Sequence, residues 1–164
     1  MRESAADLEE LQALLDESVA KASPFLRGSF EMPERSLSAA ELVARLDGML
    51  VVSLATVTAK GEPRVAPIDA VFLRGRFYVP TVAQAARARH LARRRGVSVT
   101  YYEGRTTAVI VHGRAGAVAP GEEPFDEIEE IRLAAGGESI LQWSGDPLFL
   151  RVEPDVIYTY AKEL

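Results

Sequence analysis

The sequence of 164 residues contains no cysteine. Disulfide bonds and thiolate metal sites are therefore excluded. Long apolar runs are missing as well, because the longest, Met49 to Ala55, is interrupted by Ser53 and is far too short to cross a bilayer. The segment Met1 to Lys21 is acidic and mixed, without the apolar core of a secretory signal. We therefore expect a cytoplasmic protein that does not enter a membrane.

Basic residues are also fewer than acidic residues. The chain has 19 lysines and arginines against 24 acidic residues, which gives a net charge of −5 and argues against general nucleic-acid binding. The length is that of one ordinary domain. We expect residues 1–36 to form an N-terminal helix and arm, and residues 37–164 to form the main domain.

Two helices are expected before the first strand. Apolar residues at helical spacing mark an amphipathic helix near the N-terminus, namely Leu8, Leu11, Leu15 and Val19. The stretch from Ser23 to Arg35 is expected to be a loop. Ser38 and Glu41 form a capping-box pattern that begins a short helix at Ala39. A further acidic helix is expected from Glu122 to Ala135.

From Met49 the apolar and β-branched residues predict strands. The expected strands are 49–57, 62–72, 76–79, 97–103 and 106–118, followed by one long strand over 148–160. Tight glycine turns at Gly61 and Gly75 join the first three into a meander. Pro63 and Pro67 cannot donate to a sheet ladder, so they favour an edge or bulge in the second strand. The pattern predicts a mainly β fold with peripheral helices, in which about six antiparallel strands close into a small barrel.

The most unusual local feature is an arginine-rich helix expected over Ala83 to Arg95. It carries Arg87, Arg89 and Arg93 to Arg95 with no acid among them, and like charges on one helix repel. Solvation, or pairing with the acids of Glu122 to Glu130, would offset that repulsion. Binding of an anion at the helix start would do the same, with Thr81 before the helix and Arg87 one turn into it. Arg93 to Arg95 lie at the negative helix end and are expected to be structural.

Local catalytic signatures are missing, including glycine-rich phosphate loops, nucleophile elbows and zinc helix motifs. His90 and His112 lie far apart in the sequence without matched carboxylates, which is weak support for a metal site. We therefore expect no metal and assign no catalytic residue.

The order and spacing of several short motifs resemble the pyridoxamine 5′-phosphate oxidase-like FMN-binding split-barrel family. The motifs, in chain order, are Ser53-Leu54-Ala55-Thr56-Val57, Gly61-Glu62-Pro63-Arg64-Val65-Ala66-Pro67, Phe77-Tyr78-Val79-Pro80-Thr81, Ala86-Arg87-Ala88-Arg89-His90-Leu91, Val97-Ser98-Val99 and His112-Gly113-Arg114-Ala115. Together they cover residues 37–120, with a weaker similarity around Arg151 to Pro154. Short chains with this Gly-x-Pro-Arg-Val pattern resemble the flavin/deazaflavin oxidoreductase branch.

The resemblance implies a homodimeric split β-barrel in residues 37–164, with cofactor sites at the subunit interface. The strand after the first glycine turn would pass the flavin ring, while Thr81 and Arg87 would hold the phosphate. Trp143 would reach toward the partner's site. The implied cofactor-binding residues are Arg64, Val65, Ala66, Pro67, Val79, Pro80, Thr81, Ala86, Arg87 and Trp143. Arg89 matches a family arginine with a structural role.

The chain also departs from the family pattern. A Ser-Arg pair of the phosphate oxidase is replaced by Ala85-Ala86, and a lysine after the ring-contacting strand is replaced by Asp69. The arginine-rich substrate segment at the C-terminus is not recognisable. These departures argue against oxidation of pyridoxamine phosphate. The resemblance implies an FMN-dependent oxidoreductase acting on a small molecule, with F420 as the alternative cofactor and a non-catalytic cofactor- or heme-binding module as the alternative function.

Overall fold

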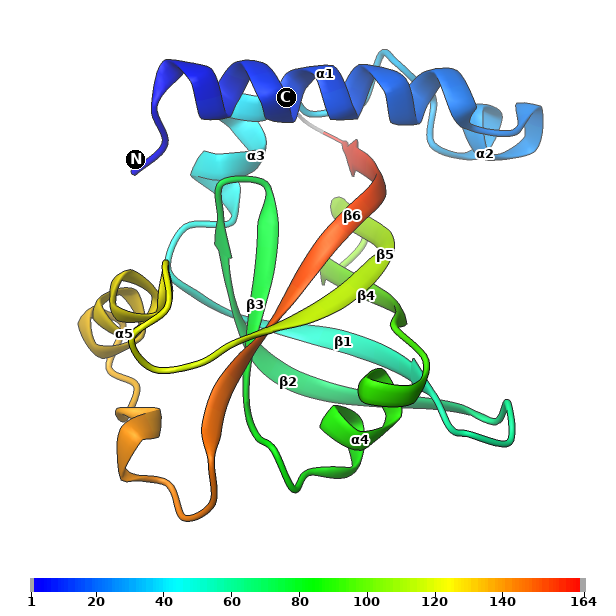
Figure 1. Ribbon diagram of the computed structural model, residues 1–164. Helices are drawn as coiled ribbons and strands as arrows, with labels where there is room; N and C mark the ends of the chain where they lie inside the picture. Colours follow the sequence, from blue (N-terminus) through cyan, green and yellow to red (C-terminus); the bar gives the residue numbers. More distant parts are fainter. Residues whose placement is uncertain (1, 163–164) are drawn as a thin grey trace.

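The computed structural model describes residues 2–162, and within them six antiparallel strands form one closed barrel in the order β1-β2-β3-β6-β5-β4 (Figure 1). The strands are β1 (Met49–Val57), β2 (Pro63–Leu73), β3 (Arg76–Val82), β4 (Gly96–Glu103), β5 (Thr107–Val118) and β6 (Pro147–Ala161). The helices are α1 (Ala5–Lys21), α2 (Pro24–Ser29), α3 (Ala39–Arg45), α4 (Ala86–Arg93), α5 (Phe125–Ala134) and the short 3₁₀ helix η1 (Ile140–Gln142). The expected mainly β architecture is confirmed.

The second strand is paired unevenly with its two neighbours in the closed barrel. β2 pairs with β1 over its whole length, but it pairs with β3 only over Val71–Leu73. Its first part, with Pro63 and Pro67, therefore has a free edge. This confirms the expected edge position of the two prolines, which have no N–H group to offer a second neighbour. The free edge leaves room for α4 beside β1 and β2.

Two helical expectations need correction. The stretch from Ser23 to Arg35 is not all loop, because α2 occupies Pro24–Ser29 with Pro24 in its first turn and Ser23 as its cap. The arginine-rich helix is shorter than expected and covers only Ala86–Arg93. Its expected start is lost because the backbone N–H of Ala83 donates to the carbonyl of Asp146, at 2.9 Å, instead of joining the helix.

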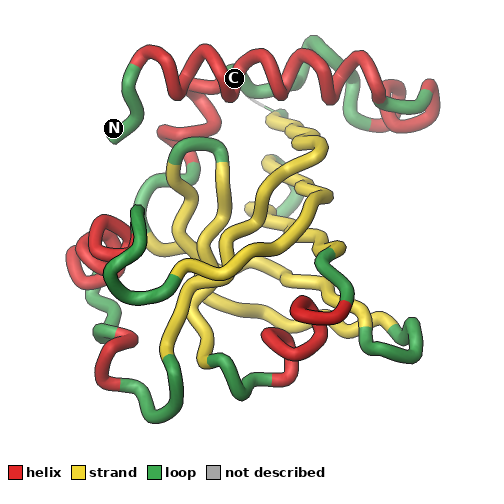
Figure 2. The backbone as a smooth tube through the Cα atoms, viewed as in Figure 1, coloured by secondary structure: helices red, strands yellow, loops and turns green. Residues whose placement is uncertain are grey.

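Buried apolar side chains fill the barrel, and helices lie at one end of it and beside parts of its outer surface (Figure 2). The α1 and α3 helices lie across one end of the barrel, and α1 contacts β6. Ser18 of α1 is fully buried, where its hydroxyl donates to the Leu14 carbonyl at 2.7 Å and accepts from the Ile157 N–H at 2.9 Å. This contact fixes α1 against β6.

A second apolar cluster lies between α5 and the outside of the barrel, and it includes Phe125, Ile128 and Phe149. Beside it, Glu129 and Arg132 are both buried and form an ion pair at 3.9 Å. The acids expected to neutralise the arginine-rich helix are therefore engaged elsewhere. Within residues 2–162, no ion pair joins an arginine of α4 to α5, so that pairing hypothesis is wrong.

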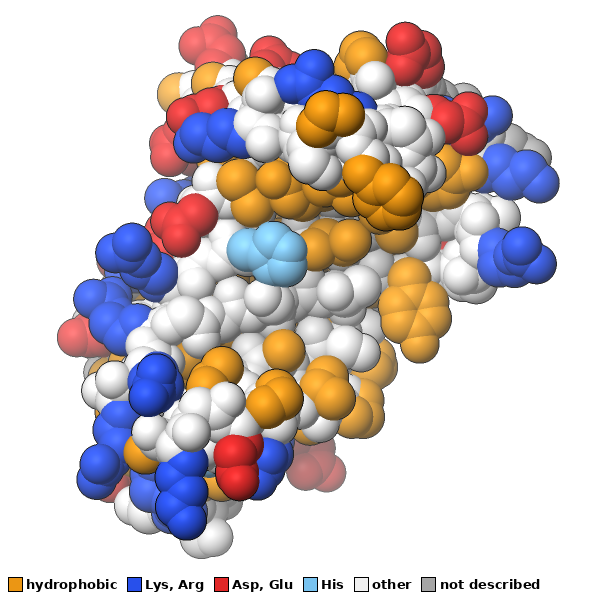
Figure 3. Space-filling model, turned by 90° about the vertical axis from the view of Figure 1, so that its right-hand side faces the viewer, with side chains coloured by type: hydrophobic (Ala, Val, Ile, Leu, Met, Phe, Trp, Pro, Cys, Tyr) orange, Lys and Arg blue, Asp and Glu red, His pale blue; other side chains and the backbone are white. Residues whose placement is uncertain are grey.

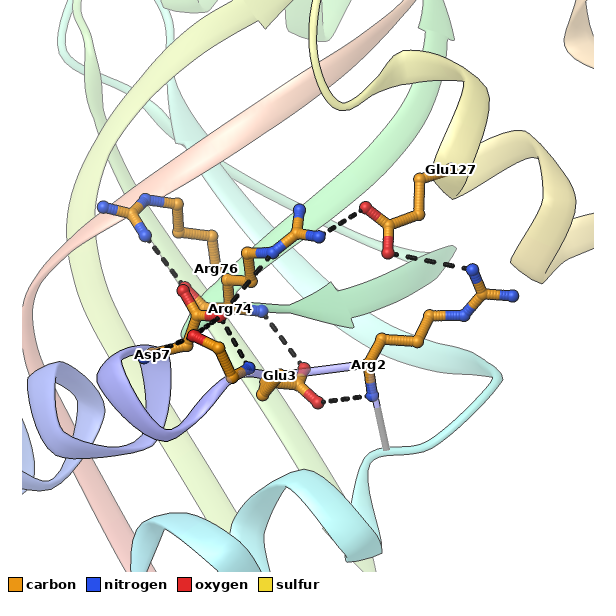
Figure 4. Close-up of polar contacts among 7 residues, drawn as sticks. Arg2, Glu3, Asp7, Arg74, Arg76 and Glu127 are labelled. Atoms are coloured by element: carbon orange, nitrogen blue, oxygen red, sulfur yellow. Dashed lines mark hydrogen bonds and ion pairs between the residues drawn. The ribbon is translucent and has the colours of Figure 1, made fainter.

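A network of charged residues ties the N-terminal segment to the β2–β3 turn and to α5 (Figure 4). Arg74 lies at its centre, pairing with Glu127 at 2.7 Å and with Asp7 at 3.9 Å. Its backbone N–H donates to Glu3 at 3.3 Å, and Arg2 reaches Glu127 at 3.7 Å. Hydrogen bonds from Ser4 hold the pKa of the Asp7 carboxyl below its ordinary value, so this carboxylate stays ionised at neutral pH.

In the part of the chain that the structure describes, no helix combines the length and the apolar character needed to span a bilayer.

Candidate functional site

A cavity of about 370 Å³ lies between α4 and the β1–β2 hairpin, and we call it the α4 pocket. Its floor comes from β1 and β2, where Leu54 pairs with Ala66 and Thr56 pairs with Arg64. Strand residues two positions apart point to the same face, so these four side chains share one face of the hairpin. The opposite wall is the first turn of α4. The lining residues are Leu54, Thr56, Thr58, Arg64, Val65, Ala66, Ala85, Ala86, Arg87 and His90.

The charge of the α4 pocket is one-sided. Arg64, Arg87 and His90 supply its ionisable side chains. Among the described residues that line it, none carries a carboxylate. The chain as a whole has a net charge of −5, so this local excess of basic groups is not a consequence of composition. Such a pocket favours an anionic ligand.

Arg87 is held at the wall of the α4 pocket. Its Nη1 atom donates to the Thr81 hydroxyl at 3.5 Å. Thr81 is 2% exposed and lies within β3, where it pairs with Leu148 of β6. Thr81 therefore lies before the helix, as expected, on β3 and ahead of the N-cap residue Ala85. It contacts Arg87 across the short turn that connects β3 to α4.

The start of α4 has no side-chain cap. Ala85 is at the N-cap, and its methyl group cannot accept a hydrogen bond from the first turn. Arg89 instead donates to the Gln84 carbonyl at 2.7 Å, which holds the connecting turn and agrees with the structural role expected for Arg89. The first-turn N–H groups beside Ala86 and Arg87 thus add to the positive potential of the α4 pocket.

The last arginines of the expected helix have other contacts. Arg94 donates to the Ala59 carbonyl at 3.1 Å, and Arg95 donates to the Ala115 carbonyl at 3.1 Å. These bonds join the end of α4 to the β1–β2 hairpin and to β5. They agree with the structural role expected at this end of the helix.

The expected ring-contacting segment of β2 contributes Arg64, Val65 and Ala66 to the α4 pocket. Val65 is 72% exposed, although it is a large apolar side chain. The Arg64 guanidinium bonds to Glu62 at 2.8 Å at the end of the hairpin. Pro67 is exposed on the same strand but does not line the pocket.

Three further residues expected at the site lie away from the α4 pocket. Val79 and Pro80 are buried in β3, where they pair with β6. Trp143 follows η1, and the guanidinium of Arg132 lies 6.0 Å from the centre of its ring. None of the three lines the α4 pocket within the described chain.

His90 and Thr56 were not among the expected site residues, although both line the α4 pocket. The Thr56 hydroxyl and the His90 Nδ1 atom lie 3.1 Å apart. Two sequence signals point to them. His90 follows Arg87 by three residues, which places both on one side of a helix, and Thr56 follows Leu54 at strand spacing.

The other side of α4 has a different character. A second cavity, of about 360 Å³, lies between α4 and strands β5 and β6. Alanine, glycine and leucine side chains form most of its lining, including Ala88, Leu91 and Ala115. Its basic group, Arg95, is bonded to the Ala115 carbonyl. Arg95 is the one basic residue among the described residues that line this cavity, whereas Arg64, Arg87 and His90 line the α4 pocket.

A broad face of the barrel, next to the α4 pocket, carries few charges (Figure 3). Outward-facing residues pair across β1, β4, β5 and β6 in two rows, and we call this surface the barrel face. The rows are Ser53, Thr100, Ile110 and Tyr158, and Ala55, Ser98, His112 and Val156. Large apolar side chains lie beside them, with Val51 and Tyr102 each 63% exposed. Apolar and uncharged polar side chains thus alternate on this face, and a shortage of charged residues is typical of the centre of an interface.

Comparisons with known proteins were made for sequence and for structure. A family model described as pyridoxamine 5′-phosphate oxidase matches residues 38–161. No curated protein matches the chain in sequence.

Solved structures share the fold at low sequence identity. A conserved hypothetical protein from Mycobacterium tuberculosis has a TM-score of 0.63 at 19% identity, over 79% of this chain and 88% of that one. The heme storage protein HutZ from Vibrio cholerae has a TM-score of 0.61 at 20% identity, over 77% of this chain and 95% of its own. An F420 reductase has a TM-score of 0.56 at 15% identity, over 70% of this chain and 94% of its own.

Proposed function

Because the chain belongs to the pyridoxamine 5′-phosphate oxidase-like split-barrel family, we propose that it is an oxidoreductase that binds FMN in the α4 pocket. The observation that carries this proposal is the basic lining of that pocket, where Arg87 and His90 lie beside Arg64 without a carboxylate among the described lining residues, and the Arg64 guanidinium itself bonds to Glu62. A phosphate group is a suitable partner for such a lining, because guanidinium groups bind phosphate oxygens through paired hydrogen bonds.

The residues present fit a phosphate-bearing cofactor. Arg87 lies at the start of α4, where the helix dipole and the uncapped N–H groups both favour an anion. The cavity of about 370 Å³ is within the size range of small-molecule sites. The exposed part of β2, from Arg64 to Pro67, provides an apolar strand edge on which an aromatic ring can rest.

The bound flavin would supply the redox chemistry, which is hydride transfer at its ring. The protein's own residues would bind and orient it. Arg87 would hold the anionic end, Thr81 holds the guanidinium of Arg87, and the β2 segment at Val65 and Ala66 would lie against the ring, with the side chain of Ala66 facing the pocket and that of Val65 exposed on the other face. The proposal needs no acid or base from the chain, and the substrate is an unidentified small molecule.

Oxidation of pyridoxamine phosphate itself is not proposed. Ala85 and Ala86 stand where that enzyme has a serine and an arginine, and neither methyl group can bond to phosphate. Asp69 replaces a lysine on β2. A different substrate fits these changes better.

F420 is the second candidate cofactor, because an F420 reductase shares the fold and a basic pocket would also hold the phosphate of a deazaflavin. A heme- or cofactor-binding module without catalysis is the third, because the heme storage protein shares the fold as well.

A titration separates these candidates. We expect FMN fluorescence to change saturably when the purified protein is added, with F420 bound more weakly and heme giving no shift of its Soret band. Preferential binding of F420 would assign the deazaflavin instead. Failure of both FMN and F420 to bind would overturn the proposed oxidoreductase function.

We also propose that two copies of the chain pair through the barrel face, which would place the α4 pocket at the subunit interface. The support is the uncharged character of the two rows across β1, β4, β5 and β6. His112 is the basic side chain within these rows, and its Nδ1 atom already bonds to the Ser98 hydroxyl at 2.7 Å. A surface with so few charges loses little hydration energy when a partner covers it.

A charge placed on the barrel face tests this arrangement. Tyr102→Lys is expected to weaken dimerisation at least about tenfold, because a lysine would be buried there without a partner. Tyr102 is 63% exposed in the single chain, so the substitution should leave folding intact. Analytical ultracentrifugation would measure the dimer dissociation constant. Leu133→Lys is the matched control, because Leu133 is 51% exposed on α5, away from this face. Equal effects of the two variants, or a monomeric wild-type protein, would contradict the proposed dimer.

A further inference from the structure

The α4 pocket contains a basic residue that the family motif does not assign to the cofactor. His90 lies one turn after Arg87 on α4, and both side chains line the pocket. We infer that His90, held in place by Thr56, binds the anionic group of the cofactor in its imidazolium form. This inference rests on the proposed function, and it supplies a donor where Ala85 and Ala86 have none.

The orientation of His90 supports this role. Its Nδ1 atom lies 3.1 Å from the hydroxyl of Thr56, and Thr56 is 5% exposed in β1. The buried threonine thereby fixes the ring. Within residues 2–162, the Nε2 atom has no hydrogen-bond partner from the protein. Nε2 is thus the atom left for a ligand, while Thr56 acts as a positioning residue.

The hydrogen-bond chemistry of the ring agrees with a cationic state. An imidazolium has two N–H donors. The Thr56 hydroxyl oxygen can accept from Nδ1–H, and a phosphate oxygen can accept from Nε2–H. Both N–H donors of the ring then have an acceptor, and an anionic ligand would supply the acceptor at Nε2.

The charged groups around His90 are basic on each side. On α4 they are Arg87 one turn before it, and Arg93 and Arg94 one turn after it. On β2 the neighbour is Arg64, whose guanidinium bonds to Glu62 outside the pocket lining. The face of β1 offers only the uncharged Leu54 and Thr56. The potential around His90 is therefore positive, and a bound anion would offset it and favour the imidazolium in the complex.

Proton uptake should therefore accompany ligand binding. A histidine changes charge between about pH 5 and 8. If the ligand stabilises the imidazolium, its contribution to affinity is present at low pH and is lost as the pH rises through the pKa of the complex. Binding should be tighter at acidic pH than at alkaline pH.

The experiment compares FMN dissociation constants at about pH 6 and 8, the range in which histidine titrates, for the wild-type protein and for His90→Gln. The phosphate of free FMN also titrates in this range, and this contribution is common to both proteins. We expect the ratio of the dissociation constants at the two pH values to differ between wild type and His90→Gln by about fivefold, less than a fully formed charge-assisted hydrogen bond would give, because solvent screens the partly open pocket. Thr56→Val keeps the imidazole but removes the hydroxyl that orients it. The dissociation constants at the two pH values should therefore differ less than they do in the wild-type protein.

His112→Gln is the matched control, because it removes an imidazole from the barrel face instead of the pocket. It should keep the wild-type ratio. Circular dichroism would verify that each variant is folded. The same pH ratio in wild type and His90→Gln would overturn the inference.

Inorganic sulfate, whose charge is constant over this range, separates the inference from the proposed function. If FMN fails to bind but calorimetry detects sulfate with the His90-dependent pH ratio, His90 is an anion-binding residue and the proposed flavin function is wrong. If neither FMN nor sulfate binds the wild-type protein, both proposals are wrong.

Discussion

Replacing Arg87 with alanine is expected to weaken FMN binding about tenfold to a hundredfold. The reason is the loss of the guanidinium at the start of α4, where Thr81 holds it at 3.5 Å. A hydrogen bond to a charged group contributes about 1.5–3 kcal/mol, and about 1.4 kcal/mol corresponds to a factor of ten in the dissociation constant. Fluorescence titration with FMN measures the change directly.

Arg93→Ala is the control for the Arg87 substitution. Arg93 is exposed in the last turn of the same helix, and it does not line the α4 pocket. The control removes the same charge from α4, so it separates a direct contact from a general electrostatic effect. It should change the dissociation constant by less than about twofold, because exposed charges are screened by solvent. An equal loss in both variants would remove Arg87 from the binding site.

Gly113→Ala is expected to destabilise the fold by about 3 kcal/mol or more, the upper range for overpacking a filled site. A β-carbon at this position would lie 2.0 Å from the carbonyl oxygen of Glu153 and 2.9 Å from the Cα of Pro154. Both are backbone atoms of β6, so no side chain can turn away. The pairing of β5 with β6 shifts its register between His112 and Gly113, which brings the two backbones together.

The free energy of unfolding, measured by urea denaturation, tests this expectation. Gly116→Ala is the matched control on the same strand, because its nearest contact would be the Arg151 side chain at 3.8 Å. It should be neutral or slightly stabilising, since alanine restricts the unfolded chain more than glycine does. Similar stability of the two variants would contradict the close approach of β5 and β6 at Gly113.

The sequence was a good guide to the barrel because strands and turns leave local signals. Apolar and β-branched residues identified β1 and β2, and the turn glycines Gly61 and Gly75 both have positive φ angles that favour glycine. These features depend on residues that are close in the sequence.

Features that depend on distant contacts were harder to predict. The start of α4 was misplaced because Ala83 bonds to Asp146, which is more than sixty residues away in the chain. For the same reason the sequence did not identify the contact between Thr56 and His90, which joins β1 to α4. A run of alanines and arginines has high helix propensity throughout, so only tertiary contacts decide where the helix begins.

The candidate site was predictable in part. The positions of Arg64 to Ala66 and of Ala86 and Arg87 follow from the motif order, and the structure brings these residues to one pocket. Val79, Pro80 and Thr81 lie in one motif, but pairing with β6 buries all three, and Thr81 reaches the site only through its hydrogen bond with Arg87. Their proximity in sequence therefore did not place them at the pocket.

The location of the bound cofactor is the most direct test of the central claim. Amide NMR spectra recorded with increasing FMN would identify the backbone groups that the ligand perturbs. The account predicts the largest chemical-shift changes at the start of α4, in Ala85 to Arg87, and on β2 at Val65 and Ala66. Changes centred instead on Ala115 to Ala117, in the apolar cavity on the other side of α4, would contradict it.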